Sequence, residues 1–394
     1  MLKKINILAL LLLLTYACGN SNPPEEDTES DETDTENSEE TVEATGESNL
    51  PLSAIQLPDG FKIDIFAEVE NARSMAMSPN GTIFVGNRQS DKVYALQDTD
   101  QDGKADQKFI IDEGLRSPNG VAFRNGDLYV AEISRILKYP AIEENLDTPP
   151  EPVVIKDDYP KDGHHGWKFI AFGPDDRLYV PVGAPCNICE SANEVYASIT
   201  SIKPDGSDMK VFAEGVRNTV GFTWHPETGD MWFTDNGRDW LGNDFPPCEL
   251  NIASKAGNHY GYPYCHGGDI ADPEFGGKFP CSDFQKPARN LGPHVAPLGL
   301  RFYTGNMFPS EYSGDLIIAE HGSWNRDSKI GYRLMHVNVE NGKATSYEPF
   351  AEGWLNDKTQ DSWGRPVDVL MLPDGSMLVS DDFADVVYRI TYES

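Results

Sequence analysis

Basic residues are scarce in this 394-residue sequence. Lysine and arginine together number 32 against 64 aspartates and glutamates, which gives a formal net charge of −32. An acidic surface repels the phosphates of nucleic acids and the headgroups of anionic lipids, so we expect no nucleic-acid partner and no attraction to a bare membrane surface. A small cation or a basic partner fits this charge better.

Long apolar runs are absent except at the N-terminus, where Ile5–Leu14 is too short to span a bilayer as a permanent helix. Two lysines precede this run and Cys18 follows it, which is typical of a cleaved export signal. We predict a lipoprotein signal peptide over residues 1–18, with lipidation of Cys18. The exported protein would touch a membrane only through this lipid, in the periplasm, at the outer membrane or on the cell surface. Thr15 stands where such signals usually have leucine, so secretion without a lipid is the alternative.

Residues 19–50 lack basic residues and nearly all large apolar side chains, while they hold twelve acidic residues. Such a segment cannot bury enough apolar surface to fold, so we predict a disordered acidic linker. Residues 51–394 hold 52 acidic and 30 basic residues, a net charge of −22, and no second linker divides them. Their length exceeds what one ordinary hydrophobic core serves, which favours one domain built from repeats over two independent domains.

Helical periodicity of useful length is also missing from residues 51–394, whereas one turn-and-strand pattern recurs six times. In each copy a turn of Pro, Asn, Asp or Gly precedes aromatic and β-branched residues, as in SPNGTIFVGN from Ser78 and RNGDLYVAE from Arg124. The other copies begin at Gly173, His225, Tyr312 and Leu372. Six similar units predict an all-β, six-bladed β-propeller, and a pair of β-sandwiches is the less economical alternative.

The spacing of the repeats predicts two further features of the propeller. The gap before Tyr312 is longer than the others, which places a large insertion between Asn251 and Pro309. We expect this inserted segment to form a roof over an active site. A strand at residues 61–66 is expected to pair with the last strand, near residues 386–391, and so to close the ring.

Several long stretches resemble the quinoprotein glucose and sorbosone dehydrogenases, and most closely the sorbosone branch. They are DGHHGWKFIAFGPDDRLYVPVGAPCNIC from Asp162, GVRNTVGFTWHPETGDMWFTDNGRDWLG from Gly215, YGYPYCHGGDI from Tyr260, HVAPLGLRFYTG from His294, IAEHGSWNR from Ile318 and GRPVDVLMLPDG from Gly364. The resemblance covers roughly the whole of residues 51–394. It implies a six-bladed propeller that uses pyrroloquinoline quinone (PQQ) and Ca²⁺ to oxidise a sugar, a sugar aldehyde or a related polyol. Electrons would pass to an external acceptor such as a cytochrome or a quinone.

The resemblance assigns roles to four residues. His165 corresponds to the family's catalytic base, which lies eight residues before the glycine of the GPD turn, here Gly173. A base that is neutral near pH 7 suits the removal of a hydroxyl proton. Arg217 and Asn218 match an Arg-Asn pair that holds the quinone oxygens, and Arg217 would also stabilise charge growing there. Arg365 matches the first of two arginines that line the cofactor site.

The sequence departs from the family's pattern at several positions. Val367 stands where the second arginine belongs, Ala184 replaces an aspartate, and Gly292 stands where an aromatic residue covers the quinone in glucose dehydrogenases. The family's cofactor-contacting lysine has no clear counterpart. Candidates for the remaining contacts with the quinone are His294, His321 and Arg326. Glucose itself is therefore an unsafe choice of substrate.

Two places are predicted to hold calcium. The family's calcium touches the quinone and is held by backbone carbonyls, and Gly237 and Arg238 occupy the matching positions. Separately, a DxDxDG loop carries four aspartates, of which the first three alternate along the chain as calcium ligands do: Asp98, Asp100, Asp102 and Asp106. Position twelve of this loop is Phe109 rather than glutamate, so a polar hairpin turn without an ion is the alternative. A filled loop would act as a structural clamp.

Cysteine is sparse, and apart from Cys18 the count is odd. The remaining five are Cys186, Cys189, Cys248, Cys265 and Cys281. In an oxidising compartment at least one of them stays free or pairs with another molecule. A bridge between Cys265 and Cys281 would staple the inserted segment. Cys186 and Cys189 could form a tight disulfide, a redox pair or half of a zinc site, and the absence of a second CxxC favours the disulfide.

The propeller fold by itself is compatible with other functions. One alternative is a calcium-dependent lactonase, in which the metal acts as a Lewis acid on a lactone carbonyl. A second alternative is a non-catalytic surface propeller that binds glycans or proteins. The Arg217-Asn218 pair together with His165 favours the dehydrogenase.

Overall fold

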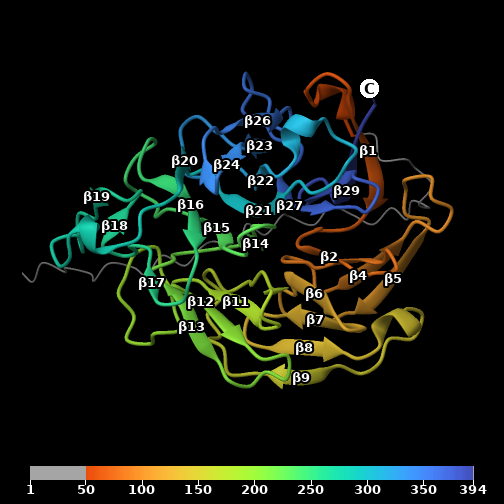
Figure 1. Ribbon diagram of the computed structural model, residues 1–394, viewed down its shortest axis with the longest axis horizontal. Coiled ribbons are helices and arrows are strands. Elements are labelled where there is room, and N and C mark those ends of the chain that lie inside the picture. The colour runs from red at the N-terminus through yellow and green to blue at the C-terminus, as the bar shows by residue number, and fades with distance from the viewer. Residues whose placement is uncertain (1–49, 394) are drawn as a thin grey trace, which may run out of the picture. The chain divides into compact units, whose positions relative to one another are not determined.

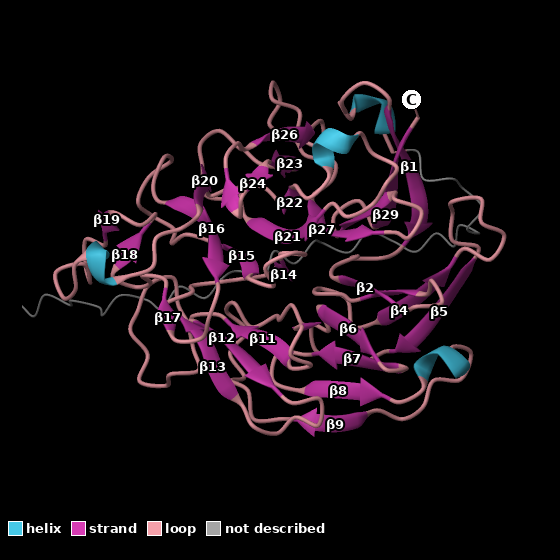
Figure 2. Cartoon of the chain, viewed as in Figure 1, coloured by secondary structure: helices cyan, strands magenta, loops and turns pink. Residues whose placement is uncertain are grey.

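The chain forms a six-bladed β-propeller in the computed structural model, which describes residues 50–393. Six sheets radiate from a common centre (Figure 1), and each contains four antiparallel strands, to which one sheet adds a fifth strand in parallel, so the predicted all-β propeller is confirmed. The only helices in this part of the chain are four single 3-10 turns, drawn in cyan in Figure 2: η1 (Leu52–Ala54), η2 (Ile142–Glu144), η3 (Cys281–Asp283) and η4 (Ser310–Tyr312). None of the described helices is long and apolar enough to cross a membrane. The predicted signal peptide and Cys18 lie outside the described residues.

The first three blades follow one another along the chain. Blade 1 contains β2 (Met75–Met77), β3 (Ile83–Val85), β4 (Val93–Gln97) and β5 (Gln107–Asp112). Blade 2 contains β6 (Gly120–Arg124), β7 (Asp127–Ala131), β8 (Ile136–Tyr139) and β9 (Val153–Lys156). Blade 3 contains β10 (Ala171–Phe172), β11 (Leu178–Val182), β12 (Ser198–Ile202) and β13 (Lys210–Glu214).

The last three blades carry the longer excursions. Blade 4 contains β14 (Phe222–Trp224), β15 (Met231–Asp235), β16 (Pro247–Ala253) and β20 (Arg289–Pro293). Blade 5 contains β21 (Pro297–Phe302), β22 (Leu316–Glu320), β23 (Arg333–Val337) and β26 (Glu348–Ala351), with a small hairpin of β24 (Val339–Glu340) and β25 (Lys343–Ala344). Blade 6 contains β27 (Pro366–Met371), β28 (Met377–Asp381), β29 (Val386–Tyr392) and β1 (Phe61–Glu68).

Each of the six predicted turns joins the first two strands of a blade. The turn after Ser78 connects β2 to β3, for example, and the turn at Leu372 connects β27 to β28. The second strand of every blade is buried along its whole length, as in β11 and β28, except that Asp127 at the start of β7 is partly exposed. This explains why the pattern was visible in the sequence, since a strand covered on both faces reads as a continuous apolar run.

The ring is closed by a strand from the beginning of the described chain. β1 pairs antiparallel with β29, with Phe61 opposite Tyr392 and Lys62 opposite Thr391, as the sequence predicted. The Phe61 ring packs edge-on against Phe308 at 4.7 Å and Phe350 at 5.1 Å between centroids, and both of these belong to the neighbouring blade 5 region. Closure thus buries apolar area as well as pairing the backbone.

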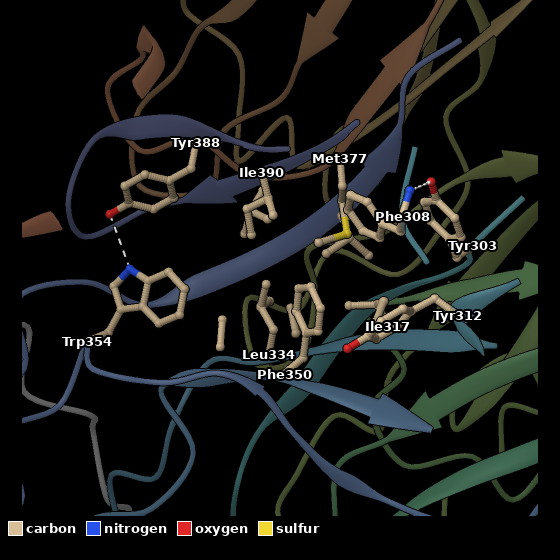
Figure 3. Packing of buried hydrophobic residues seen from close by; sticks show 14 of the residues in the cluster. Tyr303, Phe308, Tyr312, Ile317, Leu334, Phe350, Trp354, Met377, Tyr388 and Ile390 are labelled. Atoms are coloured by element: carbon tan, nitrogen blue, oxygen red, sulfur yellow. Dashed lines mark hydrogen bonds between the residues drawn. The ribbon is translucent and has the colours of Figure 1, made fainter. Parts of the chain in front are cut away.

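Apolar side chains fill the wedges between neighbouring blades. Figure 3 shows the largest of these clusters, in which Ile317 and Leu334 of blade 5 face Met377 and Ile390 of blade 6. Trp354 lies at the edge of this cluster and is fully buried, and its indole N–H donates to the Tyr388 hydroxyl at 3.3 Å. Burial of side chains from two blades in each wedge makes every blade depend on its neighbours.

The insertion is shorter than predicted. It runs from residue 254 to residue 288, between β16 and β20 of blade 4, and contains β17 (Asn258–His259), β18 (Cys265–His266) and β19 (Ile270–Ala271). The prediction extended it to Pro309 because the gap before Tyr312 also holds β20, β21 and a long hairpin loop. β17 adds in parallel to β13, so the inserted segment bridges blades 3 and 4.

Two disulfides and one free thiol account for the five cysteines among the described residues. Cys265 is bonded to Cys281 within the inserted segment, and Cys186 is bonded to Cys189 in the loop after β11. The tight disulfide that the sequence favoured for Cys186 and Cys189 is therefore confirmed. Cys248 is a free thiol on β16, buried among apolar side chains.

Replacing Phe61 by alanine tests the closure of the ring. Because the ring packs against four aromatic neighbours at the closure, we expect Phe61→Ala to lower the free energy of unfolding by about 2–4 kcal/mol. The neighbouring Lys62 is exposed and forms only an exposed ion pair with Glu393, so Lys62→Ala should cost less than about 1 kcal/mol. Denaturant titration measures the free energy of unfolding of both variants. Equal unfolding midpoints for Phe61→Ala and Lys62→Ala would show that closure of the ring does not limit stability.

Removing the Cys265–Cys281 bridge tests the inserted segment. The bridge closes a loop with a sequence separation of 16 residues, and loss of such a constraint costs up to about 3 kcal/mol. We expect the double variant Cys265→Ser, Cys281→Ser to melt at a lower temperature than Cys248→Ala, at one scan rate. In the presence of dithiothreitol the double variant and the natural protein should melt together. A difference that persists under reduction would mean that the serines, rather than the lost bridge, cause it.

Candidate functional site

One face of the propeller collects the predicted site residues. The segment before the first strand of a blade and the segment after the second strand meet at this face, because the two strands are antiparallel; in blade 6, for example, Pro366 lies opposite Asp381. We call it the entry face. His165 precedes β10, Arg217 and Asn218 precede β14, His294 precedes β21, His321 follows β22 and Arg365 precedes β27. All six therefore lie on the same face of the ring.

The centre of this face has an apolar floor. Val220, Leu298 and Val367, from blades 4, 5 and 6, form one buried cluster, and Trp167 of blade 3 packs against it. Val367 stands where the resemblance led us to expect an arginine, and its contacts explain the change, because a charge here would be buried among apolar side chains. Because the floor itself is apolar, the polar groups that could hold a ligand lie around it.

His165 is held with one ring nitrogen engaged. Its Nδ1–H donates to the Ala184 carbonyl at 2.9 Å, while no described residue bonds to Nε2. Its backbone has a φ of +48°, in the left-handed region. Gly183 permits this arrangement, because a Cβ there would lie 2.5 Å from the His165 Cβ. Burial, and then the charge of Arg217, hold the pKa of His165 well below 6.5, so the ring is neutral at pH 7.

Arg217 is buried and its donors are largely committed to the protein. Nε donates to the Asn187 carbonyl at 2.9 Å, and NH2 donates to the Asn187 side chain at 2.9 Å and to the Asp239 carboxylate at 3.2 Å. NH1 donates to the Asn236 carbonyl at 3.2 Å. Of five N–H groups, a single one on NH1 is left for a ligand. Asn187 lies between the two cysteines of the Cys186–Cys189 disulfide, so this bridge fixes the loop that fixes Arg217.

The same backbone contact positions an arginine in three blades. The amide N–H groups of Arg116, Arg217 and Arg365 donate to Glu132, Asp235 and Asp381 at 2.8, 2.9 and 2.8 Å, respectively. Each acceptor is at or directly after the end of the second strand of its blade. Burial raises the pKa of Asp235 and of Asp381 to about 6 in each case. The acidic residues thus anchor the loops that carry the cationic side chains.

Next to Arg217, several polar groups have no partner within the described chain. The Asn218 backbone N–H donates to Asp235 at 2.7 Å, but its side-chain amide makes no hydrogen bond. The Thr219 hydroxyl and the Trp167 indole N–H are buried and also lack a partner. Buried polar groups without partners are rare in native proteins. This donor set fits a polar ligand seated above the apolar floor.

A second polar network lies between blades 5, 6 and 1. His321 Nε2–H donates to Asp382 at 2.7 Å, Arg73 NH1 donates to the other oxygen of Asp382 at 2.8 Å, and Arg365 Nε donates to the His321 carbonyl at 3.1 Å. Burial, and then the charge of Arg365, lower the pKa of His321 to about 3. His321 and Arg73, by contrast, hold the pKa of Asp382 well below its usual range. The network supplies neutral and cationic donors around one buried carboxylate.

The inserted segment forms a wall of this face. Tyr262 accepts the Cys189 backbone N–H at 3.0 Å, and Asp272 accepts Arg238 NH1 at 2.7 Å. A small cavity between this wall and blade 4 is lined by Gly237 and by the buried carboxyls Asp235 and Glu249. Burial, and then the charge of Asp235, raise the pKa of Glu249 to about 7.

The predicted calcium ligands on this wall are backbone groups. The carbonyls of Gly237 and Arg238 accept no hydrogen bond within the described chain, which leaves them available to a cation. The Arg238 side chain points into the wall, where it pairs with Asp272 and with Glu274 at 3.1 Å. The two carbonyls and the chemistry of the neighbouring carboxyls are compatible with Ca²⁺, a hard cation that takes oxygen ligands.

Two of the predicted cofactor contacts brace loops instead of facing an open space. His294 is buried, and its Nε2–H is shared between the carbonyls of Gly242 at 2.9 Å and Phe245 at 3.0 Å. Arg326 donates through NH1 to the Asn243 carbonyl and through Nε to the Ser328 carbonyl at 3.1 Å. Both side chains hold the 242–245 loop, and their contact with a cofactor stays a prediction.

The DxDxDG loop lies on the opposite face, where β4 turns into β5. Asp98, Asp100 and Asp102 bring carboxylate oxygens within 4.8 Å of one another, and one oxygen of Asp98 is buried without a partner. The predicted fourth ligand turns away, because the Asp106 carboxylate accepts the Thr99 backbone N–H at 3.0 Å and the Thr99 hydroxyl. Since the loop is remote from the entry face, an ion here would act on stability.

A family model described as a domain of unknown function, DUF7133, matches residues 47–389. The chain belongs to this family. An uncharacterised protein of Borreliella burgdorferi is 33% identical over 360 residues, which cover 86% of this chain and 92% of that protein. A pyrroloquinoline quinone-dependent pyranose dehydrogenase of Coprinopsis cinerea is 31% identical over 123 residues, which cover 27% of this chain and 16% of that protein.

Solved structures share the fold of this DUF7133 member. The iodide structure of the Trichoderma reesei Carbohydrate-Active Enzymes family AA12 protein has a TM-score of 0.77 at 20% identity, covering 89% of this chain and all of that one. The holo form of the pyranose dehydrogenase PQQ domain of Coprinopsis cinerea has a TM-score of 0.71 at 17% identity, covering 86% of this chain and 97% of that one. Likeness to the sorbosone branch stays a prediction from the sequence.

Sequence reasoning missed Arg73, Asp382 and Asn187. Arg73 lies shortly before the first strand of blade 1, as Arg217 and Arg365 do in their blades, so alignment of the repeats would have found it. Asp382 follows β28 directly but contacts Arg73 across 309 residues of sequence, and no local signal reveals such a contact.

Lys168, beside the site, gives the DUF7133 protein a testable pH dependence. It is buried, its ammonium donates to the Gly166 carbonyl at 2.9 Å, and burial lowers the pKa of Lys168 from 10.5 to about 7. Between pH 7 and 10.5 the unfolded chain binds a proton that the folded chain lacks, so stability should rise with pH across this window. Below pH 7 the cost of burying the charge is present in full.

We therefore expect Lys168→Met to melt at a higher temperature than the natural protein at pH 7 and below. The difference should shrink as the pH rises toward 10.5, which thermal melts at a series of pH values measure. Lys203→Met, at an exposed position, is the matched control and should give a constant difference. If the difference in melting temperature between Lys168→Met and the natural protein also stays constant from pH 7 to 10.5, this lysine is charged in the folded state.

Proposed function

We propose that this protein oxidises a sugar, a sugar aldehyde or a related polyol with PQQ and Ca²⁺, and passes the electrons to an external acceptor such as a cytochrome or a quinone. The observation that carries the proposal is His165, which has a neutral ring, an open Nε2 and a position beside the Arg217-Asn218 pair. The likeness in fold to the PQQ domain of pyranose dehydrogenase supports it. So does the stretch of sequence shared with that enzyme.

The residues present fit a planar, polyanionic cofactor. Arg217 offers its remaining N–H, Asn218 offers an unengaged amide, and Arg365 offers the N–H groups that do not bond to the loop at His321. The partnerless Thr219 hydroxyl and Trp167 indole N–H add neutral donors beside them. The bound quinone would supply the acceptor for the two electrons that leave the substrate as hydride.

In this proposal His165 is the base that takes the substrate's hydroxyl proton. The Ala184 carbonyl holds the Nδ1–H tautomer, so the lone pair of Nε2 points away from this anchor and can accept a proton. The low pKa keeps the ring unprotonated before substrate arrives. The positive charge that forms on the ring is disfavoured by Arg217, which makes passing the proton onward favourable.

Ca²⁺ would be held by the carbonyls of Gly237 and Arg238, which no described group occupies. These carbonyls come directly after Asn236, whose own carbonyl accepts Arg217, so the cation and the guanidinium would lie on one loop. Together they place positive charge where the cofactor's negative oxygens would lie. The acidic protein, with a net charge of −22 over residues 51–394, would otherwise repel such a cofactor.

The export of the protein and its lipid anchor at Cys18 are also part of the proposal, and they rest on the sequence of residues 1–18 alone. An anchor would hold the enzyme beside a membrane through its lipid. An acceptor at that membrane could then collect the electrons without a diffusing carrier.

Two variants of the entry face should fail in different ways. A positioned base contributes roughly a hundredfold to ten-thousandfold, so His165→Gln should lower single-turnover rates by about that factor and leave PQQ affinity unchanged. Arg217→Ala should weaken PQQ binding in calorimetry as well, and removal of Ca²⁺ by chelation should do the same to the natural protein. Because His165 has a lowered pKa, the rate should not fall as the pH drops through 6.5.

The control for this pair is His164→Gln, whose ring lies 4.0 Å from that of His165 between centroids. It should keep most of the activity. If neither histidine variant loses more than about tenfold in single turnover, proton removal by this loop is wrong. Calcium-dependent hydrolysis of a lactone without PQQ would then support the lactonase, and glycan binding without turnover would support a binding propeller.

A further inference from the structure

Two tryptophans stand exposed on the entry face. Trp240 is 69% exposed and Trp324 is 62% exposed, the highest values among the large hydrophobic residues that the structure describes. Their rings are 5.3 Å apart between centroids and nearly perpendicular, at 85°. Trp240 lies in the loop after β15 and Trp324 in the loop after β22. An exposed pair of indoles costs free energy in water, so it points to a function for these rings.

The protein holds this pair in place against a strained backbone. Trp240 has a φ of +68°, in the left-handed region, where bulky side chains are rarely found. The two loops are bonded to each other, because Asn243 donates to Asp327 at 2.8 Å and Arg326 donates to the Asn243 carbonyl. The left-handed backbone of Trp240 costs free energy, and the bonds between the two loops help to offset that cost.

The pair is joined directly to the proposed site. Asn325, the residue after Trp324, donates to Asp239 at 2.7 Å, and Asp239 is the residue before Trp240. The other oxygen of Asp239 accepts Arg217 at 3.2 Å. One carboxylate therefore holds both tryptophan loops and the arginine of the site, and a ligand spanning the rings would extend toward Arg217.

The surroundings of the pair select for a neutral, hydroxyl-rich ligand. Asp244 and Asp327 are exposed carboxylates on the same two loops, and they can accept hydrogen bonds from hydroxyls. Arg326 pairs with Asp244 at 3.5 Å, so these three side chains carry a net charge of −1, which favours a neutral ligand over a tricarboxylate such as the quinone. The faces of two indoles suit the C–H face of a sugar ring, whereas two rings fall well short of the roughly 800 Å² that each partner buries in a stable protein interface.

We propose that Trp240 and Trp324 bind a pyranose ring of an oligosaccharide whose neighbouring sugar is oxidised at His165. This inference rests on the proposed function and deepens it, because it makes a sugar chain the preferred substrate over a free monosaccharide. The ring next to the oxidised unit stacks on the indoles, and its hydroxyls donate to the carboxylates beside them. Binding at this place needs neither quinone nor calcium.

Calorimetry on the full-length protein without PQQ tests the proposal separately from the redox chemistry. The probes are glucose, maltotetraose, cellotetraose and xylotetraose. We expect at least one tetraose to bind more tightly than glucose, and Trp324→Ala or Trp240→Ala to weaken it by roughly tenfold. Trp324→Phe, which keeps an aromatic face, should recover most of the affinity. Phe279→Ala, which removes an exposed ring of the inserted segment, is the matched control and should bind as the natural protein does.

Three results would overturn the proposal. The first is that no tetraose binds more tightly than glucose, although the protein binds PQQ and turns over. The second is that the tryptophan variants lose PQQ affinity and keep oligosaccharide affinity, which would make the rings part of the cofactor site. The third is that they slow electron transfer to a basic cytochrome and leave saccharide binding unchanged. With loaded enzyme, Trp324→Ala should raise KM for the tetraose by a larger factor than KM for glucose.

Discussion

Antiparallel pairing of β1 with β29 is the constraint on which the rest of this structure depends. It joins a strand from the start of the described chain to the last one, so blade 6 is made from both ends. Without it blade 6 would expose an unpaired edge, and the wedge between blades 5 and 6 would lose the packing of Phe61. Since the loops of all six blades face one another only when the ring is closed, the site requires this pairing.

Buried acidic residues carry the next level of organisation. Glu132, Asp235 and Asp381 cap the second strands of three blades and accept backbone N–H groups from the arginine loops. The hydrogen bonds that such a carboxylate accepts offset part of the cost of leaving water, and the raised pKa of Asp235 and of Asp381 reflects the part that they do not offset. The acidic residues of the sequence, from which we expect no nucleic-acid partner, thus have a second role inside the fold.

The sequence predicted those parts of the molecule that have local signals. The turns at Ser78 and Leu372 and the closing strand were predictable because turn residues and buried strands leave a pattern in consecutive residues. The end of the insertion was predicted too late, since the gap before Tyr312 also holds β20, β21 and the long hairpin loop after β21. The partners of Arg217 and Arg73 had no local signal. Asn187 meets Arg217 through the packing of blade 3 against blade 4, and Asp382 meets Arg73 only through the closure of the ring.

Backbone strain separates the entry face from the rest of the fold. Most described residues with a positive φ, apart from glycines, are small or polar residues in turns, which tolerate this conformation. The four that carry aromatic or imidazole rings are His165, Trp240, His294 and Tyr332, and all four lie on the entry face. Each costs about 1–3 kcal/mol, a cost that the blade wedges must offset. Selection for stability alone would remove this backbone strain. The strained residues instead gather on the face that holds the partnerless donors and the open nitrogen of His165. We conclude that ligand binding has shaped this face.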